Sequence, residues 1–131
     1  FLGICVGMQL TADVGEENQE VDGLGWVPGK VVKINPQNPS LKIPHMGWNS
    51  VKLTSSKHPI KSTLRKETEM YFVHSYHFEV KNSDHLLGTT DYEETLAAIV
   101  GKDNIIGTQF HPEKSQLAGL KFIERFVRWR P

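Results

Sequence analysis

The first ten residues contain the pattern that most limits how this chain can fold. Phe1 to Val6 is an apolar run that predicts a short buried strand, and the residues from Gly7 to Ala12 are mostly helix formers. Between them, Gly3-Ile4-Cys5-Val6-Gly7 places glycines two positions before and after Cys5. A strand that turns sharply into a helix brings these positions so close that side chains there would collide. The pattern therefore predicts a strand, a tight turn and a helix, with Cys5 at the turn.

A cysteine on such a turn is a candidate nucleophile. At the start of a helix, backbone amides and the helix dipole lower the pKa of a thiol, and the Val6 N–H would be an oxyanion donor. Cys5 is also the chain's one cysteine, which excludes an internal disulfide and a zinc cage built of cysteines. The alternative is a small buried apolar residue, which is the usual role of a single cysteine.

A second motif, GTQFHPEKS at residues 107–115, supplies an imidazole and a carboxylate. Pro112 disfavours helical backbone at the residue before it, so His111 should be extended. Residues two apart in an extended chain point to the same side, so Glu113 can orient the imidazole. On its own this motif could be an unused surface turn. Taken together, Cys5, His111 and Glu113 form a nucleophile, a base and an orienting carboxylate.

The rest of the chain is mixed. Alternating or β-branched segments predict strands within 27–34, 48–53, 70–80, 86–90, 96–100 and 105–110, and polar segments predict loops at 15–25, 35–40 and 55–66. With a helix near each end and strands between, the expected class is α/β or α+β.

The C-terminal segment changes to a helical period. Its apolar residues recur at spacings of three or four and predict a helix that packs one face on the core: Leu117, Leu120, Ile123 and Val127. We expect Ser115 or a neighbouring residue to cap this helix and Arg128 and Arg130 to lie near its negative end.

Charge and hydropathy exclude some functions. Lys plus Arg and Asp plus Glu are both 15, so the net charge is zero and gives no general case for binding nucleic acid or an anionic membrane. No apolar stretch approaches the roughly 20 residues of a membrane span. With one cysteine, the expected compartment is the reducing cytoplasm or an organelle stroma.

Four motifs together resemble one enzyme family. FLGICVGMQL and GTQFHPEKS are similar to the two signatures of class I (triad) glutamine amidotransferases. Pro44–Asn49 (PHMGWN) and Tyr71–Tyr76 (YFVHSY) resemble the branch of glutaminase subunits of imidazole glycerol phosphate synthase, in histidine biosynthesis. The motifs occur in the family's order over residues 1–115. The resemblance implies an α/β, flavodoxin-like three-layer sandwich with a mixed sheet.

The resemblance also implies site residues. Cys5 would be the nucleophile, His111 the acid/base and Glu113 its orienting partner. Gln9 would bind glutamine, Glu17 would contact the amino group of the substrate, and the backbone of Ser75 and Tyr76 would hold its carboxylate. No metal or other cofactor is implied. Gln9 as a solvated helix residue, and Ser75 and Tyr76 as ordinary strand residues, are the alternatives.

The implied activity is hydrolysis of glutamine to glutamate and ammonia through a γ-glutamyl thioester. In the family, ammonia passes to a (β/α)8-barrel cyclase subunit, so a heterodimer is expected. Met46, Trp48, Tyr71 and Lys114 resemble the face that meets this barrel. For Met46 and Tyr71 the alternative is core packing, and for Lys114 a solvated side chain.

The family's domain begins before the position of Phe1. We therefore expect residues 1–131 to be the C-terminal part of a single domain. The first strands, and a glycine-containing loop with the second oxyanion donor, would be missing. An open apolar sheet edge and a lost oxyanion donor predict that these residues alone aggregate or are inactive.

Three other interpretations stay open. The chain could be a glutaminase of the anthranilate or aminodeoxychorismate type, although those usually have histidine at the position of Met8 and lack the PHMGWN segment. It could be a partner-binding module without catalysis. A metal site formed by His74, His77, His111, Glu113 and Cys5 is disfavoured, because His74 and His77 are three apart in a predicted strand and face opposite sides.

Overall fold

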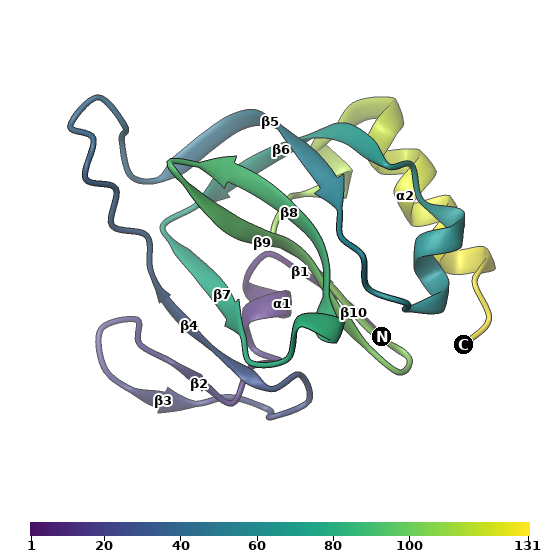
Figure 1. Ribbon diagram of the computed structural model, residues 1–131, viewed down its shortest axis with the longest axis horizontal. Coiled ribbons are helices and arrows are strands. Elements are labelled where there is room, and N and C mark those ends of the chain that lie inside the picture. Colours follow the sequence, from purple (N-terminus) through teal and green to yellow (C-terminus); the bar gives the residue numbers. More distant parts are fainter.

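A six-stranded mixed sheet forms the centre of the protein (Figure 1). The computed structural model describes residues 1–131. The strand order is β1 (Leu2–Ile4), β10 (Ile105–Thr108), β9 (Glu94–Lys102), β8 (Leu86–Tyr92), β5 (His45–Leu53) and β6 (Glu67–His74). Strands β1 and β10 run parallel, and every other neighbouring pair is antiparallel. The predicted opening strand and the strands predicted at 48–53, 86–90, 96–100 and 105–110 are confirmed within these elements.

A second, four-stranded sheet has the order β3 (Val21–Asp22), β2 (Val14–Gly15), β4 (Gly29–Lys33) and β7 (Tyr76–Val80). The strand predicted within 27–34 is confirmed as β4. The predicted 70–80 strand is two strands in different sheets, with the change at Ser75. The prediction of a loop at 15–25 was wrong in part, because Gly15 ends β2 and β3 pairs with it.

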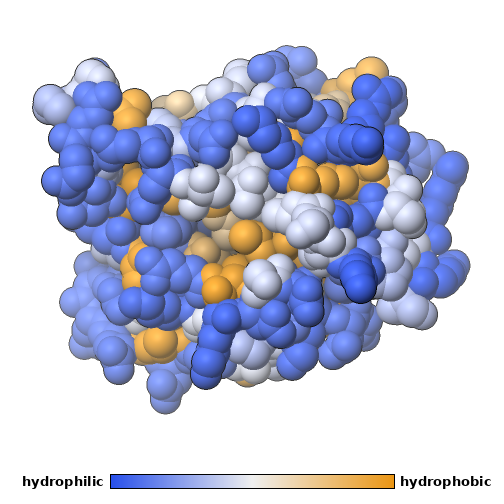
Figure 2. Space-filling view, viewed as in Figure 1, coloured by the Kyte–Doolittle hydropathy of each residue, from blue (hydrophilic) through white to orange (hydrophobic).

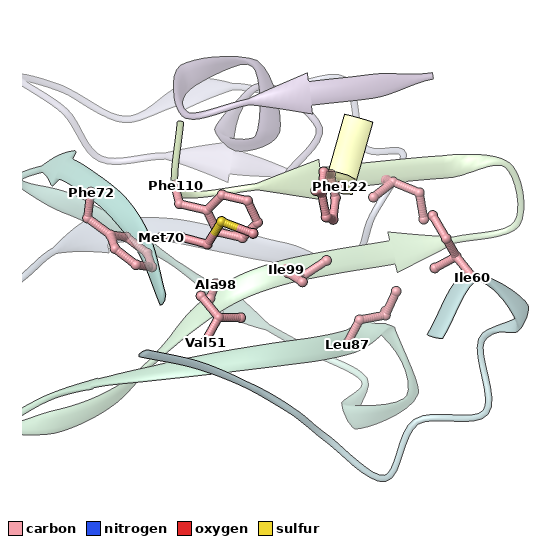
Figure 3. Packing of buried hydrophobic residues seen from close by; sticks show 10 residues of the cluster. Val51, Ile60, Met70, Phe72, Leu87, Ala98, Ile99, Phe110 and Phe122 are labelled. Carbon is pink, nitrogen blue, oxygen red and sulfur yellow. The ribbon is translucent and has the colours of Figure 1, made fainter. Parts of the chain in front are cut away.

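The core lies on both faces of the large sheet, and β9 contributes to each side. One cluster joins the sheet to α2 (Gln116–Arg128) and includes Phe110 and Phe122 (Figure 3). The other joins the sheet to α1 (Val6–Gln9) and to the small sheet, and includes Met8 and Phe78. The arrangement is an α/β sandwich, with α2 on one face and α1 with the small sheet on the other.

Short 3-10 turns complete the chain: η1 (Pro59–Thr63), inside the predicted 55–66 loop, η2 (Ser83–His85) and η3 (Pro112–Lys114). Neither helix combines the length and the apolar character needed to cross a membrane. Figure 2 shows a mostly hydrophilic face on which apolar residues reach the surface near the middle.

Helix α2 forms where it was predicted, but the predicted core face was wrong. Of the four predicted residues, Leu117, Leu120 and Val127 are 62–65% exposed and Ile123 is half-buried, whereas Phe122 and Gly119 are buried. The helix is apolar on more than one side, so its spacing allowed two packings. Contact with η3 selects one of them: a Cβ on Gly119 would lie 1.8 Å from the Pro112 carbonyl oxygen, so only glycine allows this approach.

Candidate active site

Cys5 lies on a strained turn between β1 and α1. Its backbone has φ 51° and ψ −109°, outside the conformations that a residue with a side chain prefers. Its N–H donates to the Thr108 carbonyl at 2.7 Å, which fixes the turn beside the end of β10. A Cβ on Gly3 would lie 2.4 Å from the Gly7 carbonyl oxygen, so the predicted steric need for glycine is confirmed there. At Gly7 that prediction was wrong, because a Cβ would meet open space.

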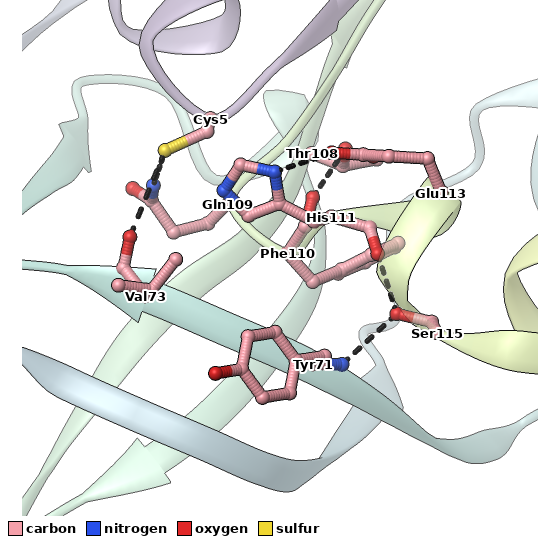
Figure 4. Close-up of polar contacts among 9 residues, drawn as sticks. All are labelled: Cys5, Tyr71, Val73, Thr108, Gln109, Phe110, His111, Glu113 and Ser115. Carbon is pink, nitrogen blue, oxygen red and sulfur yellow. Dashed lines mark hydrogen bonds and ion pairs between the residues drawn. The ribbon is translucent and has the colours of Figure 1, made fainter.

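The thiol of Cys5 is partly buried and has two polar neighbours. Its S–H donates to the Val73 carbonyl at 3.9 Å, and the Gln109 Nε2 donates to Sγ at 3.7 Å (Figure 4). Burial raises the pKa of Cys5, while the Val6 amide and Gln109 act against the rise. The predicted lowering was therefore wrong in sign: α1 has only four residues, and its amides do not outweigh desolvation.

His111 and Glu113 meet as predicted. The Nδ1 of His111 lies 2.6 Å from the Glu113 Oε1. His111 is extended at φ −99°, as predicted, but Glu113 belongs to the 3-10 turn η3. The predicted pairing is therefore correct, whereas the extended backbone from which it was predicted is wrong at Glu113. A carboxylate only accepts, so Nδ1 carries the hydrogen and Nε2 of the neutral ring is a free acceptor. Nε2 is buried without a partner, and Figure 4 shows that side of the ring turned toward Cys5.

Ser115 holds this turn in place. Its hydroxyl donates to the His111 carbonyl at 2.6 Å and accepts from the Tyr71 N–H at 2.9 Å (Figure 4). The His111 N–H in turn donates to the Tyr71 carbonyl at 2.9 Å. The predicted capping of α2 by the Ser115 side chain was wrong. The hydroxyl instead donates to His111 and accepts from Tyr71, and so joins η3 to β6.

A row of polar groups formed by Tyr76, Gln9 and Gln109 leads to the Cys5 thiol. The Gln9 Nε2 lies 3.1 Å from the Tyr76 carbonyl oxygen and 3.1 Å from the Gln109 Oε1. Ser75 lies at the change from β6 to β7, and its carbonyl accepts from the Ile34 N–H. The structure thus brings Gln9 and Tyr76 together near Cys5.

Gln109 was missed by the sequence analysis. It is fully buried and contacts both Cys5 and Gln9. The available signal was a polar residue in the apolar end of a strand, two positions before His111.

The remaining predicted residues make no hydrogen bond to the thiol. Glu17 is exposed in the turn between β2 and β3, and no hydrogen bond joins its carboxylate to the other site residues. Met46 and Trp48 are 60% and 47% exposed on one face of β5. Trp48 lies opposite Tyr71 on β6, with ring centroids 6.1 Å apart. Lys114 is exposed on η3.

Metal ligands are not grouped in this structure. No cluster of three or more His, Cys, Asp and Glu side chains is placed to hold a metal ion. His74 closes β6 and His77 belongs to β7, in the other sheet.

Comparison with known proteins gives consistent matches. A family profile described as "Glutamine amidotransferase class-I" matches residues 1–128. "Imidazole glycerol phosphate synthase subunit HisH" of Zymomonas mobilis is 53% identical over 131 residues, covering 100% of this chain and 60% of that protein. The protein of the same name from Rhodospirillum rubrum is 51% identical, with 100% and 61% covered. The chain thus spans about 60% of the length of these relatives.

Solved structures agree on the fold. A protein described as a GMP synthase component, from Thermoplasma acidophilum, has a TM-score of 0.63 and 25% identity, covering 96% of this chain and 54% of that one. A glutamine amidotransferase from Thermotoga maritima has a TM-score of 0.60 and 19% identity, covering 97% and 46%. At 19% identity, the similarity to the Thermotoga maritima protein concerns the fold alone.

Proposed function

This chain belongs to the class I glutamine amidotransferase family, and on that premise we propose that it is the glutaminase part of an imidazole glycerol phosphate synthase. The reaction is hydrolysis of glutamine to glutamate and ammonia. The observation that carries the proposal is the His111–Glu113 pair, whose unpartnered Nε2 is turned toward Cys5 on the strained turn.

The first step is attack by Cys5 on the side-chain carboxamide of glutamine. Because burial raises the pKa of Cys5, the thiol must lose its proton during attack, and the His111 Nε2 is the acceptor. The S–C bond forms, the carbonyl becomes an oxyanion, and the Val6 N–H is one donor to it. Glu113 stabilises the imidazolium that results.

The second step breaks the C–N bond. His111 gives its proton to the leaving nitrogen, ammonia departs and a γ-glutamyl thioester remains on Cys5. His111 then takes a proton from water as the water attacks the thioester. Collapse of that adduct releases glutamate and returns the proton to the sulfur.

Glutamine would lie beside the row formed by Gln9 and the Ser75–Tyr76 backbone. The Gln9 amide points at the Tyr76 carbonyl, which supports a binding role for this segment. Glu17 is proposed to contact the substrate's amino group, which requires its exposed turn to approach the site.

The proposed partner is a (β/α)8-barrel cyclase that takes up the ammonia, in the cytoplasm. The exposed side chains of Met46 and Trp48 and the half-buried ring of Tyr71, with Lys114 beside the triad, supply a face of the kind enriched at interfaces. Exposure of Met46 argues against its alternative role in the core.

The test uses the full-length protein with and without the cyclase subunit. We expect glutamine hydrolysis that the cyclase accelerates and that Cys5→Ala abolishes. Activity that survives Cys5→Ala would refute the mechanism. Acceleration by an anthranilate-type synthase partner and not by the cyclase would assign the chain to the other branch.

A further inference from the structure

Two buried histidines face each other behind the Ser75–Tyr76 segment. His45 opens β5 and His74 closes β6, and they are direct cross-strand partners. They are 3% and 6% exposed. The His45 Nδ1 lies 2.8 Å from the His74 Nε2. Burial lowers the pKa of each to about 4, so both rings are neutral near pH 7.

The surrounding groups fix which nitrogen of each ring carries hydrogen. The His74 Nδ1 lies 2.7 Å from the Tyr76 carbonyl oxygen, which only accepts, so Nδ1 is protonated and Nε2 is bare. The bare Nε2 must accept from the His45 Nδ1–H. The His45 Nε2 is then bare, and the Asn49 Nδ2 at 3.2 Å donates to it. Both histidines are therefore Nδ1–H tautomers, the less common form of free histidine in water.

The hydrogen-bonded row ends at a group of the proposed glutamine site. The Tyr76 carbonyl accepts from His74 and also, at 3.1 Å, from Gln9. Tyr76 begins β7 directly after Ser75, where the chain leaves one sheet for the other. The Tyr76 carbonyl therefore lies where the chain passes from the large sheet to the small one. There the His74 Nδ1–H is a fixed hydrogen-bond donor that orients it.

We propose that His45 and His74 are positioning residues for glutamine binding: His74 holds the Tyr76 carbonyl, and through it the Gln9 amide, and His45 holds the His74 ring. This inference rests on the proposed function. The pair does not touch the thiol or the triad in any observed hydrogen bond, so its effect should fall on substrate binding more than on the chemical step.

Two substitutions of the same histidine separate the two bonds. The side-chain amide of asparagine can place N–H near the position of Nδ1, so His74→Asn keeps a donor for Tyr76. Glutamine reaches the position of Nε2, so His74→Gln keeps a partner for His45 and loses the donor to Tyr76. In the full-length protein we expect His74→Gln to raise KM for glutamine about 3- to 10-fold, as loss of one hydrogen bond does, with kcat nearly unchanged. His74→Asn should recover most of the KM.

A matched control comes from another histidine. His58 is partly buried and bonds the Asp103 carbonyl at 2.9 Å, remote from the proposed site. Asparagine keeps a group near Nδ1 of His58 and loses the Nε2 bond to Asp103, so His58→Asn should alter thermal stability without raising KM. An unchanged KM in folded His74→Gln, or an equal rise in His58→Asn, would overturn the proposal.

The second measurement does not depend on activity. ¹⁵N NMR of the imidazole nitrogens in the full-length protein should show His45 and His74 as Nδ1–H tautomers at neutral pH. A bare Nδ1 on either ring would overturn the proposal. The predicted tautomers in a protein that hydrolyses no glutamine would instead contradict the proposed function, and leave the pair's hydrogen-bonded arrangement supported.

Discussion

Replacing Glu113 by glutamine removes one charge beside the proposed base and changes little else. The Glu113 Oε1 lies 2.6 Å from the His111 Nδ1, and glutamine can still accept that hydrogen bond. The loss is the attraction between carboxylate and imidazolium in the transition state. For charges about 4 Å apart this is about 1 kcal/mol in water and about 4 kcal/mol near a protein surface. The Glu113 side chain is 50% exposed, so the lower part of that range, about 1 to 2.5 kcal/mol, applies.

This difference predicts a kcat for glutamine hydrolysis about 5- to 70-fold lower in Glu113→Gln than in the unmodified full-length protein. The control is Glu94→Gln. Glu94 is 53% exposed and its Oε1 lies 4.0 Å from the Nε2 of His77, a second carboxylate–histidine pair outside the site. Steady-state assays should show unchanged kcat for Glu94→Gln. An unchanged kcat in Glu113→Gln, or the same decrease in both variants, would refute the assignment of Glu113 as the orienting carboxylate.

Three further predictions concern stability and can be checked by unfolding of the full-length protein. Gly3→Ala should destabilise by about 1 to 3 kcal/mol because its Cβ meets backbone, whereas Gly7→Ala, which meets open space, should not; equal effects would contradict the steric argument. Ser115→Ala should cost about 1 to 3 kcal/mol by leaving the Tyr71 N–H unpaired, and a neutral result in urea denaturation would contradict this role of the hydroxyl. Because burial lowers the pKa of His45 and of His74 from 6.5 to about 4, the unfolded chain binds more protons between these values; the thermal midpoint should rise with pH across that window, and a flat profile would contradict burial of neutral rings.

The turn around Cys5 was predictable because its constraint is local. Strand, glycine and helix formers lie within ten residues, and the clash at Gly3 involves a residue four positions away. The pairing of His111 with Glu113 was predictable for the same reason. The backbone conformation of Glu113 was not predictable, because Pro112 starts a 3-10 turn that Ser115 and β6 hold in place.

The packing of α2 depends on tertiary contacts. Spacing selected Leu117, Leu120, Ile123 and Val127 as the core face, yet Phe122 is the residue buried against Phe110. Which apolar side of such a helix is buried is decided by tertiary contacts, which periodicity does not contain.

The pKa of Cys5 and the role of Gln109 also depend on tertiary contacts. The helix start alone predicts a lowered pKa, but burial against residues far along the chain reverses the sign. Gln109 becomes a site residue only because β1 and β10 lie side by side, 100 positions from Gln9.

Trapping of the nucleophile tests the central claim most directly. A glutamine analogue with a chloroketone in place of the carboxamide should bind the site of the full-length protein and alkylate the attacking group. We predict one label per protein, carried by Cys5 in the peptide mass spectrum, with glutamine protecting Cys5 and activity lost in proportion to labelling. A label on another residue, or full glutamine hydrolysis after Cys5 is completely labelled, would contradict it.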